Sequence, residues 1–227
     1  MLKNLSNKTE KNDMKGRAFT EQESQVLADI IINRRTEFGK NFISKEIPDS
    51  IVERLLSAAL HAPSVGFSQP WEFIIIRDPL IKAKVKDSFI KENEKAKKIF
   101  KDRPFYNQLQ LEGITAAPVN IAVFYKPSPN SVVGQTSQEK FGPYSVCLAI
   151  QNLWLMARAE NLGLGWVSIL DEKEVKMILN APLENELIAY LCIGYVTEFT
   201  ERPLLEITNW EKRKLKESII YYDGYQN

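Results

Sequence analysis

Hydrophobic residues are spaced along this chain in two alternating patterns, one typical of helices and one typical of strands. Apolar positions three or four residues apart predict amphipathic helices, and runs of β-branched and aromatic residues predict buried strands. The predicted helices are 19–35, 49–62, 80–100, 144–163 and 171–180, and the predicted strands are 72–78, 118–125, 164–170 and 187–196. No repeat or interdomain linker interrupts this order, so the pattern predicts a single α+β domain.

Local signals mark where several of these helices begin and end. Thr20 and Glu23 have the spacing of a capping box, and Asp49 is placed to cap the second helix. The segment 144–163 is apolar on nearly every side. It is predicted to be a central helix, buried all round or at a subunit interface, with Gly163 as its C-cap.

The balance of charge argues against two kinds of partner. The 30 Lys and Arg residues and 29 Asp and Glu residues give a net charge of +1, so no overall field attracts nucleic acid or an anionic membrane. The longest apolar runs are far shorter than the ~20 residues of a membrane-spanning helix. Residues 1–16 are polar and predict a flexible tail before a domain over 17–227, and the protein is expected to be cytoplasmic.

The chain is poor in residues that bind metals. Cys147 and Cys192 lie far apart in apolar runs, where free cysteine behaves as a small hydrophobic residue, so a disulfide is not expected. The single histidine, His61, leaves a zinc or facial-triad site without its ligands. We expect His61 to be a buried structural histidine, and no metal is predicted.

Two loops have compositions that suggest binding. The stretch APSVGFSQPWEFIII, residues 62–76, places polar side chains beside aromatic ones, a mixture that suits a flat ligand with polar edges: Ser64, Ser68 and Gln69 beside Phe67 and Trp71. The alternative is a tight loop whose polar groups satisfy only its own backbone. Residues 126–143 are rich in proline, serine and glycine and predict a lid or a partly disordered segment.

Basic residues gather at two places far apart in sequence. Arg34 and Arg35 end the first helix, and 211–216 reads EKRKLK. Two such groups can close around one phosphate monoester, although arginines at this position also stabilise the C-terminal end of a helix dipole. The GLGWVS segment at 163–168 is not a dinucleotide-binding turn, because it follows a helix and precedes a strand.

Several strings together resemble the nitroreductase-like flavoproteins and, within them, the 5,6-dimethylbenzimidazole synthases. The strings are APSVGFSQPWEFIIIRDP, LQLEGITAAPVNIAV, YSVCLAIQNLWLMARAENLGLGWVSIL and YLCIGYV, with the two arginines that end the first helix. The resemblance extends from about Arg17 to Tyr222, nearly the whole chain. It implies an α+β fold with a central, mostly antiparallel sheet flanked by helices. It also implies an intertwined homodimer with FMN at the subunit interface and a C-terminal arm that embraces the partner.

The resemblance also assigns residues to the cofactor. It implies that the FMN phosphate is held by Arg34, Arg35 and Arg213. The other positions that it assigns to FMN are Thr36, Ser64, Phe67, Ser68, Gln69, Leu111, Gly165, Trp166 and Ser168.

The implied activity is the fragmentation of reduced FMN by O2 to 5,6-dimethylbenzimidazole, the lower ligand of cobalamin, so that FMN is cofactor and substrate. In this family an aspartate after the arginine pair and a serine in GWVS carry the chemistry. Ser168 matches that serine, but Thr36 stands where the aspartate is expected, and Glu37 offers a carboxylate from a shifted position. Ser168, Glu37 and Thr36 are the predicted catalytic residues, and Glu37 is the candidate base for a proton on the ribityl carbon next to the ring.

Two other functions remain open. Loss of the aspartate leaves FMN binding intact, which is compatible with an NAD(P)H-dependent oxidoreductase of nitro or quinone compounds. The second open function is that of a module that binds flavin without catalysing a reaction. The deiodinase branch is disfavoured by the string SVGFSQPW. The sequence does not distinguish delivery of reduced FMN by a separate flavin reductase from its reduction in place by a nicotinamide.

Overall fold

The computed structural model describes residues 16–103, 106 and 112–225. Contacts between residues divide the chain into two compact units, 1–32 and 33–227, which are described separately below.

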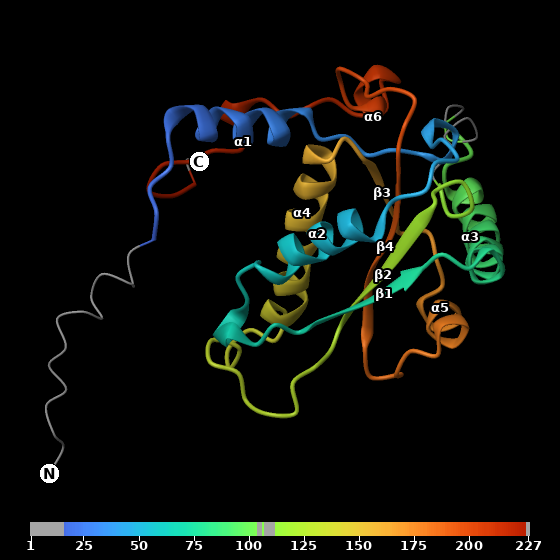
Figure 1. The fold of residues 1–227 in the computed structure, drawn as a ribbon, viewed down its shortest axis with the longest axis horizontal. Helices are drawn as coiled ribbons and strands as arrows, with labels where there is room; N and C mark the ends of the chain where they lie inside the picture. Colours follow the sequence, from blue (N-terminus) through green and yellow to red (C-terminus); the bar gives the residue numbers. More distant parts are fainter. Residues whose placement is uncertain (1–15, 104–105, 107–111, 226–227) are drawn as a thin grey trace, which may run out of the picture. The chain divides into compact units, whose positions relative to one another are not determined.

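The second unit contains the sheet and most of the helices (Figure 1). Its helices are α2 (Asp49–Leu60), α3 (Pro79–Ile99), α4 (Phe141–Ala159), α5 (Glu172–Leu179) and α6 (Leu204–Ile207). Its strands are β1 (Trp71–Ile76), β2 (Val119–Tyr125), β3 (Gly163–Val167) and β4 (Glu186–Gly194). Short 3₁₀ turns are η1 (Gly39–Asn41), η2 (Val65–Phe67) and η4 (Lys216–Ser218). Each predicted helix and strand is present, with its ends shifted by a few residues.

The four strands form one antiparallel sheet in the order β1-β2-β4-β3. Helices α2 and α4 cover one face of the sheet, and α3 and α5 cover the other (Figure 1). Side chains of β2 alternate between two cores, so that Ile121 packs with α2 and α4 while Ala122 packs with α3 and α5. The predicted α+β class with an antiparallel sheet flanked by helices is therefore confirmed, and β3 is an edge strand.

The first unit contains α1 (Glu21–Asn33), which begins at the predicted capping box. The Glu23 amide donates to Thr20 Oγ1 at 3.3 Å, and the Thr20 amide donates to Glu23 Oε2 at 2.9 Å. These two bonds satisfy amides that the first turn of a helix leaves without intrahelical partners, so the predicted helix start is confirmed.

Several local predictions were wrong, each for a physical reason. Asp49 is the first helical residue after Pro48 and pairs with Arg77 at 2.6 Å instead of capping the helix. Helix α4 ends at Ala159, and Gly163 starts β3 instead of capping the helix.

The burial of three predicted core features also differs. Helix α4 buries one face but exposes Tyr144 and Leu148, so within this chain it is not buried all round. Cys147, on the same helix, is exposed. His61 is exposed as well, with Nδ1 2.7 Å from the Ser57 carbonyl oxygen, because it lies at the end of α2.

Within the described residues, no helix combines the length and the apolar character needed to cross a membrane.

Candidate functional site

The turn that follows α1 gathers positive charge. The Arg34 guanidinium is half-buried and stacks over the Trp154 ring of α4, 4.5 Å from its centroid. Burial lowers the pKa of Arg34, and the positive charges of Arg35 and Arg213 lower it further. The structure thus brings the three predicted phosphate ligands close enough to repel one another. An anion relieves such repulsion, and arginines bind phosphate oxygens in a fork-shaped geometry.

Arg35 also ties the turn to the segment after β4. It is buried, and its Nε donates to the Thr200 carbonyl at 3.0 Å while Nη2 donates to the Glu201 carbonyl. A third bond runs from Nη1 to the Arg34 carbonyl at 2.8 Å. Three hydrogen bonds from the Arg35 guanidinium therefore go to backbone carbonyls. Arg34, in contrast, has the stacked, half-buried position of a ligand-binding side chain.

A small cavity of about 140 Å³ opens between this turn and the start of α6. Its lining residues are Arg34, Arg35, Thr36, Phe38, Pro203, Leu204 and Leu205. The cavity thus combines arginine donors and the Thr36 hydroxyl with an apolar wall. This combination suits a phosphate joined to a carbon chain.

The two residues after Arg35 point in opposite directions. Thr36 forms an isolated parallel β-bridge with Leu164, and the Glu37 amide donates to the Leu164 carbonyl at 3.0 Å. Successive residues of extended backbone face opposite sides. Thr36 is exposed and lines the cavity, whereas Glu37 is only 3% exposed and is not among the lining residues. The structure does not bring the two predicted catalytic residues of the turn to the same face.

The Glu37 carboxyl lies in the protein interior. Its Oε2 accepts a hydrogen bond from Asn41 Nδ2 at 2.9 Å. Burial raises the pKa of Glu37, against opposing contributions from that bond and from the positive charges of Arg158 and Arg35. Glu37 is therefore a buried carboxylic acid group with a hydrogen-bond donor from its own chain.

The glycines of β3 make room for this turn. A Cβ atom at Gly163 would lie 2.7 Å from Glu37 Cγ, and one at Gly165 would overlap the Glu37 carbonyl oxygen. The GLG pattern therefore has a packing explanation: only residues without side chains let residues 36–37 lie directly against the strand. Gly165, a predicted cofactor residue, therefore lies against the backbone of the 36–37 turn.

Beyond this turn, the outer edge of β3 is available for hydrogen bonding. The Leu164 carbonyl bonds outward to the turn, and backbone groups of alternate residues point to the same side of a strand, so the amide and carbonyl of Trp166 also face outward. Ser168 follows the strand and is exposed. It lies four residues beyond Leu164, or ~13 Å along an extended chain. A ligand held at Arg34 can extend along this edge towards Ser168.

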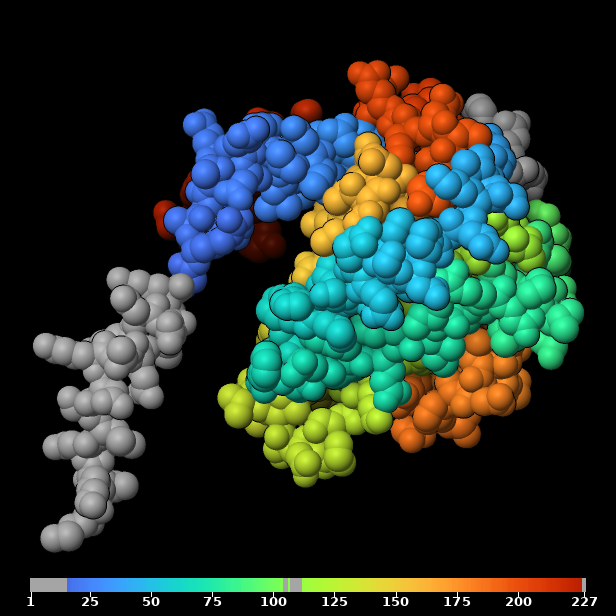
Figure 2. Space-filling model, viewed as in Figure 1, coloured from blue at the N-terminus to red at the C-terminus, as the bar shows by residue number. Residues whose placement is uncertain are grey.

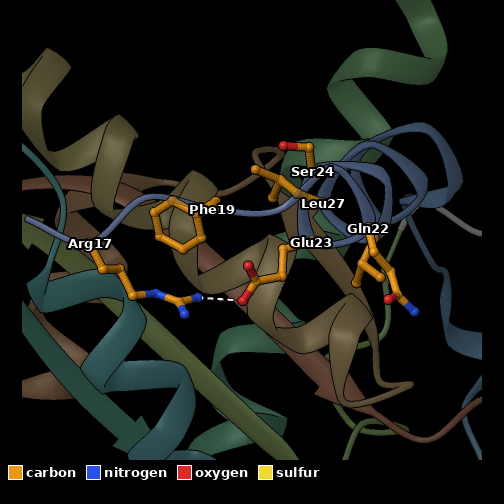
Figure 3. Close-up of a pocket in the computed structure, with 7 residues that line it drawn as sticks. Arg17, Phe19, Gln22, Glu23, Ser24 and Leu27 are labelled. Carbon is orange, nitrogen blue, oxygen red and sulfur yellow. Dashed lines mark hydrogen bonds and ion pairs between the residues drawn. The ribbon is translucent and has the colours of Figure 1, made fainter.

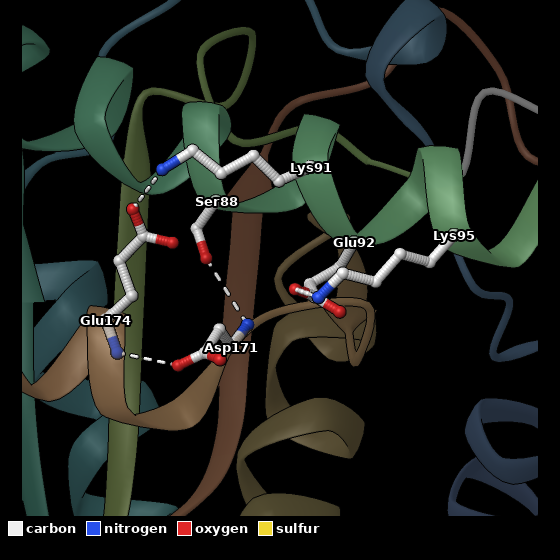
Figure 4. Close-up of polar contacts among 6 residues, drawn as sticks. All are labelled: Ser88, Lys91, Glu92, Lys95, Asp171 and Glu174. Carbon is white, nitrogen blue, oxygen red and sulfur yellow. Dashed lines mark hydrogen bonds and ion pairs between the residues drawn. The ribbon is translucent and has the colours of Figure 1, made fainter.

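The segment that follows Ser168 is bonded to α3 through Asp171 (Figure 4). Ser88 of α3 is fully buried, and its Oγ accepts from the Asp171 amide at 3.3 Å. Asp171 in turn caps α5 by accepting from the Glu174 amide at 2.9 Å. Ser168 thus lies in a short segment that is held at one end by β3 and at the other by a capped helix.

The 64–69 loop has a strained backbone, and some of its polar groups form hydrogen bonds within the loop. Gly66, Phe67 and Gln69 have positive φ angles of 55°, 53° and 47°, which are rare for residues with side chains. Ser64 Oγ accepts from the Gln69 amide at 3.0 Å, as the alternative reading of this loop expected. Ser68 Oγ is buried without a hydrogen-bond partner among the described residues. Strain together with an unpartnered hydroxyl is typical of a ligand-binding loop.

The aromatic residues of this loop do not enclose a cavity in this chain. Phe67 is 81% exposed, and Trp71 packs into the core against α2 and α4. Trp71, which the sequence placed beside the polar residues of a flat ligand site, is thus a core residue. For Phe67, a place in such a site requires a surface from outside this chain.

The loop is anchored at the opposite end of α4 from the arginines. The Val65 amide donates to Ser145 Oγ at 3.1 Å, near the start of α4, and Arg158 Nε donates to the Asn33 carbonyl at 3.0 Å, near its end. Thirteen residues of helix separate these anchors, a span of ~20 Å. The predicted cofactor residues therefore form two groups, one around Arg34 and one at 64–69.

Residues 126–140 lie beside the loop group. A Cβ atom at Gly66 would lie 2.8 Å from the Val133 carbonyl oxygen. Figure 2 shows this segment, in yellow-green, next to the teal 62–69 loop and away from the orange-red α6. The segment is thus placed to cover the 64–69 loop. Leu111, another predicted cofactor residue, lies outside the described residues.

The first unit has a hollow along α1 that contains none of the predicted site residues (Figure 3). Its lining residues are Arg17, Phe19, Gln22, Glu23, Ser24, Val26 and Leu27. Arg17 pairs with Glu23 at 2.6 Å and stacks over Phe19 at 4.3 Å. Its charged group is thus already paired within the unit.

The nitroreductase family model matches residues 31–195, and the chain belongs to this family. Three relatives are named 5,6-dimethylbenzimidazole synthase. The protein of Rhodospirillum rubrum is 38% identical over 179 residues, 77% of this chain and 85% of the relative. That of Rhodobacter capsulatus is 36% identical over 199 residues, 86% of this chain and 95% of the relative. The resemblance to these synthases is confirmed.

Solved structures with the same fold are more distant in sequence. An iodotyrosine deiodinase bound to FMN and 3-iodo-L-tyrosine superposes with a TM-score of 0.66 at 22% identity, covering 88% of this chain and 100% of the other. Nitroreductase A of Vibrio parahaemolyticus gives a TM-score of 0.66 at 17% identity, covering 88% of this chain and 77% of the other. These superpositions establish the nitroreductase fold.

Sequence reasoning missed several residues that build the site. Trp154 supports Arg34, Asn41 holds Glu37 and Ser145 holds the loop, yet none follows from a local motif. Leu204 and Leu205, which line the cavity, also escaped notice. Apart from the bond within the 34–42 turn, these contacts join the turn or the 64–69 loop to α4 or to the segment after β4, so only correlations between those segments would have signalled them.

Proposed function

We propose that this protein fragments reduced FMN with O2 to give 5,6-dimethylbenzimidazole. The observation that carries the proposal is the identity of 33–38% with three proteins named 5,6-dimethylbenzimidazole synthase. The matches cover 85–95% of each relative. FMN is then the substrate, and its dimethyl-substituted ring becomes the ring of the product.

The residues around the turn fit FMN. Arg34 and Thr36 line the cavity of about 140 Å³, and Arg213 adds positive charge near Arg34. The outward amide of Trp166 and the Ser168 hydroxyl continue the polar surface along β3. The phosphate is thus assigned to the arginine end and the ring to the Ser168 end. When bound, FMN supplies a reducible ring that reacts with O2.

Ser168 has the clearest chemical role among the described residues. Its hydroxyl is exposed at the end of an edge strand, on a turn fixed by Ser88 and Asp171. A fixed donor stabilises charge that develops on a nearby oxygen better than water does, because it needs no reorganisation. We assign Ser168 to hold an oxygen atom of the reacting flavin system and to help exclude water.

The 64–69 loop is assigned to the same flavin from a second copy of the chain. Within one chain its anchor at Ser145 lies nine residues, or ~14 Å, along α4 from Trp154, over which Arg34 stacks. A symmetric dimer brings the loop of each subunit to the arginine group of its partner. The exposed α4 residues Tyr144 and Leu148 offer an apolar surface for this contact. The unpartnered Ser68 hydroxyl and the exposed Phe67 would then meet the flavin.

One observation favours a second candidate function. The residue that lines the cavity next to the arginines is Thr36, which cannot serve as a carboxylate base. A chain that binds FMN but lacks such a base is suited to conventional electron transfer from NAD(P)H to nitro or quinone compounds.

One assay separates these functions. Purified protein is incubated with FMN, a flavin-reducing system and air, and 5,6-dimethylbenzimidazole is identified by chromatography and mass. The proposal expects product from the wild-type protein and ~100-fold less from Ser168→Ala, the typical cost of removing one fixed donor. No product, together with rapid NAD(P)H-driven reduction of a nitroaromatic, would favour the second function.

A further inference from the structure

We propose that Glu37 is a positioning residue. Its carboxyl, held by Asn41, fixes the turn so that Arg34 and Thr36 face the flavin, and Glu37 itself does not accept a proton from the substrate. This inference rests on the proposed function of the same site. It replaces the expectation that Glu37 substitutes for the missing aspartate as the base.

The direction of the side chain is the first observation. Thr36 and Phe38, on either side of Glu37, line the cavity together with Arg34, and Glu37 does not. Its Cγ atom instead lies against Gly163, at the start of β3. Ser168 is five residues further along, ~16 Å in extended backbone, so the carboxyl points towards the end of the strand away from Ser168.

The second observation is that Asn41 is itself fixed by the main chain. The main-chain N–H of Asn41 donates to the Phe38 carbonyl at 3.0 Å, and the main-chain carbonyl of Asn41 accepts from the Thr197 N–H at 3.0 Å. Phe42, the next residue, forms an antiparallel bridge with Val196. The bond from Asn41 to Glu37 therefore connects the turn to the segment that directly follows β4.

The third observation is electrostatic. Burial raises the pKa of Glu37, against opposing contributions from the Asn41 bond and from the positive charges of Arg158 and Arg35. Arg35 is occupied with backbone carbonyls, and Arg158 donates to the Asn33 carbonyl and to Asn161. A neutral amide of the same shape can therefore replace the carboxyl and still accept from Asn41. This makes glutamine the informative substitution.

The variants Glu37→Gln, Glu37→Ala and Asn41→Ala test the inference. Affinity for oxidised FMN is measured by flavin fluorescence, and product formation is measured across pH. We expect Glu37→Gln to stay within about 3-fold of wild type in both, with an unchanged pH profile. We expect Glu37→Ala and Asn41→Ala each to weaken FMN binding about 10-fold, because a loosened turn misplaces its ligands. Val85→Ala, a core substitution in α3, controls for lost stability and should leave FMN affinity unchanged.

Thermal unfolding across pH gives a readout that does not depend on FMN. A carboxyl with a raised native pKa contributes stability below its unfolded pKa, and that contribution is lost as the pH rises through the native value. Glutamine does not ionise. The Tm of Glu37→Gln minus that of wild type should therefore be larger at pH 7 than at pH 4. An unchanged difference would contradict the buried position of the carboxyl.

Product formation by Glu37→Gln decides between a positioning residue and a base. If Glu37→Gln loses 100-fold or more of product while FMN affinity is retained, Glu37 is the base and the inference is overturned, since general bases contribute about 10²–10⁴-fold. If wild type forms no product, the proposed function fails, but the affinity and unfolding series still decide the positioning role. Equal FMN affinity in all three variants would also overturn the inference.

Discussion

Arg34 and Glu37 lie three residues apart, yet their environments assign them opposite tasks. Arg34 is half-buried over Trp154 with like charges nearby, so it gains from an anion. Glu37 is buried with a hydrogen-bond donor supplied by the chain itself, so it needs no ligand. The sequence shows two charged residues in one turn, and only their burial and orientation distinguish ligand binding from structural support.

The clustered arginines predict stabilisation by phosphate. Inorganic phosphate binds the native state and relieves the repulsion between Arg34, Arg35 and Arg213, so it should raise the Tm of the FMN-free protein in proportion to occupancy. The measurement is thermal unfolding at constant ionic strength, with chloride as the reference anion. Arg34→Ala should remove most of the rise, whereas Arg77→Ala, which removes a surface arginine paired with Asp49, should keep it. Equal shifts in all three proteins would place the phosphate elsewhere.

At the level of elements, spacing in the sequence predicted the helices and strands well, because each has a strong apolar face. It failed where an element depends on distant partners. Helix α4 has an apolar sequence on nearly every side, but among the described residues Tyr144 and Leu148 on one face are exposed. The GLG segment offered no sign that its glycines accommodate the turn at 36–37, since that contact joins residues far apart in sequence.

The candidate site was predictable only in part for the same reason. Ser168 and the arginine pair follow from short motifs in the sequence, and the structure places the arginines with Arg213. The direction of Glu37 does not follow from any motif, because it depends on backbone pairing with Leu164. The separation of the 64–69 loop from the arginines also required the geometry of α4.

The contact between α3 and the Ser168 turn predicts an effect of Ser88. In Ser88→Ala the Asp171 amide loses its acceptor, which should lower the free energy of unfolding by ~1–3 kcal/mol, and product formation should fall as the turn loosens. FMN affinity should change less, since the arginine end is untouched. Lys95→Ala removes an exposed pair with Glu92 on the same helix and should change neither property (Figure 4). Product formation by Ser88→Ala at the wild-type rate would show that this anchor does not position Ser168.

At the scale of the whole molecule, the two residue groups predict a site shared between chains. A variant lacking Arg34 and a variant with Ser68→Ala and Gln69→Ala should each be nearly inactive. Heterodimers of the two contain one site with both defects and one intact site, so a randomly reassorted equal mixture should recover about a quarter of wild-type activity. The measurement is product formation after the variants are refolded together. Recovery no greater than the sum of the separate variants would mean that one chain supplies the whole site.

The central claim is that the ring of FMN becomes the ring of 5,6-dimethylbenzimidazole. Its most direct test is a single turnover with FMN that carries ¹³C in the dimethyl-substituted ring, with enzyme in excess, chemical reduction and exposure to air. The account predicts labelled 5,6-dimethylbenzimidazole by mass spectrometry, formed as labelled FMN disappears. Complete recovery of the label as intact FMN, after the protein has bound, reduced and reoxidised it, would contradict the account.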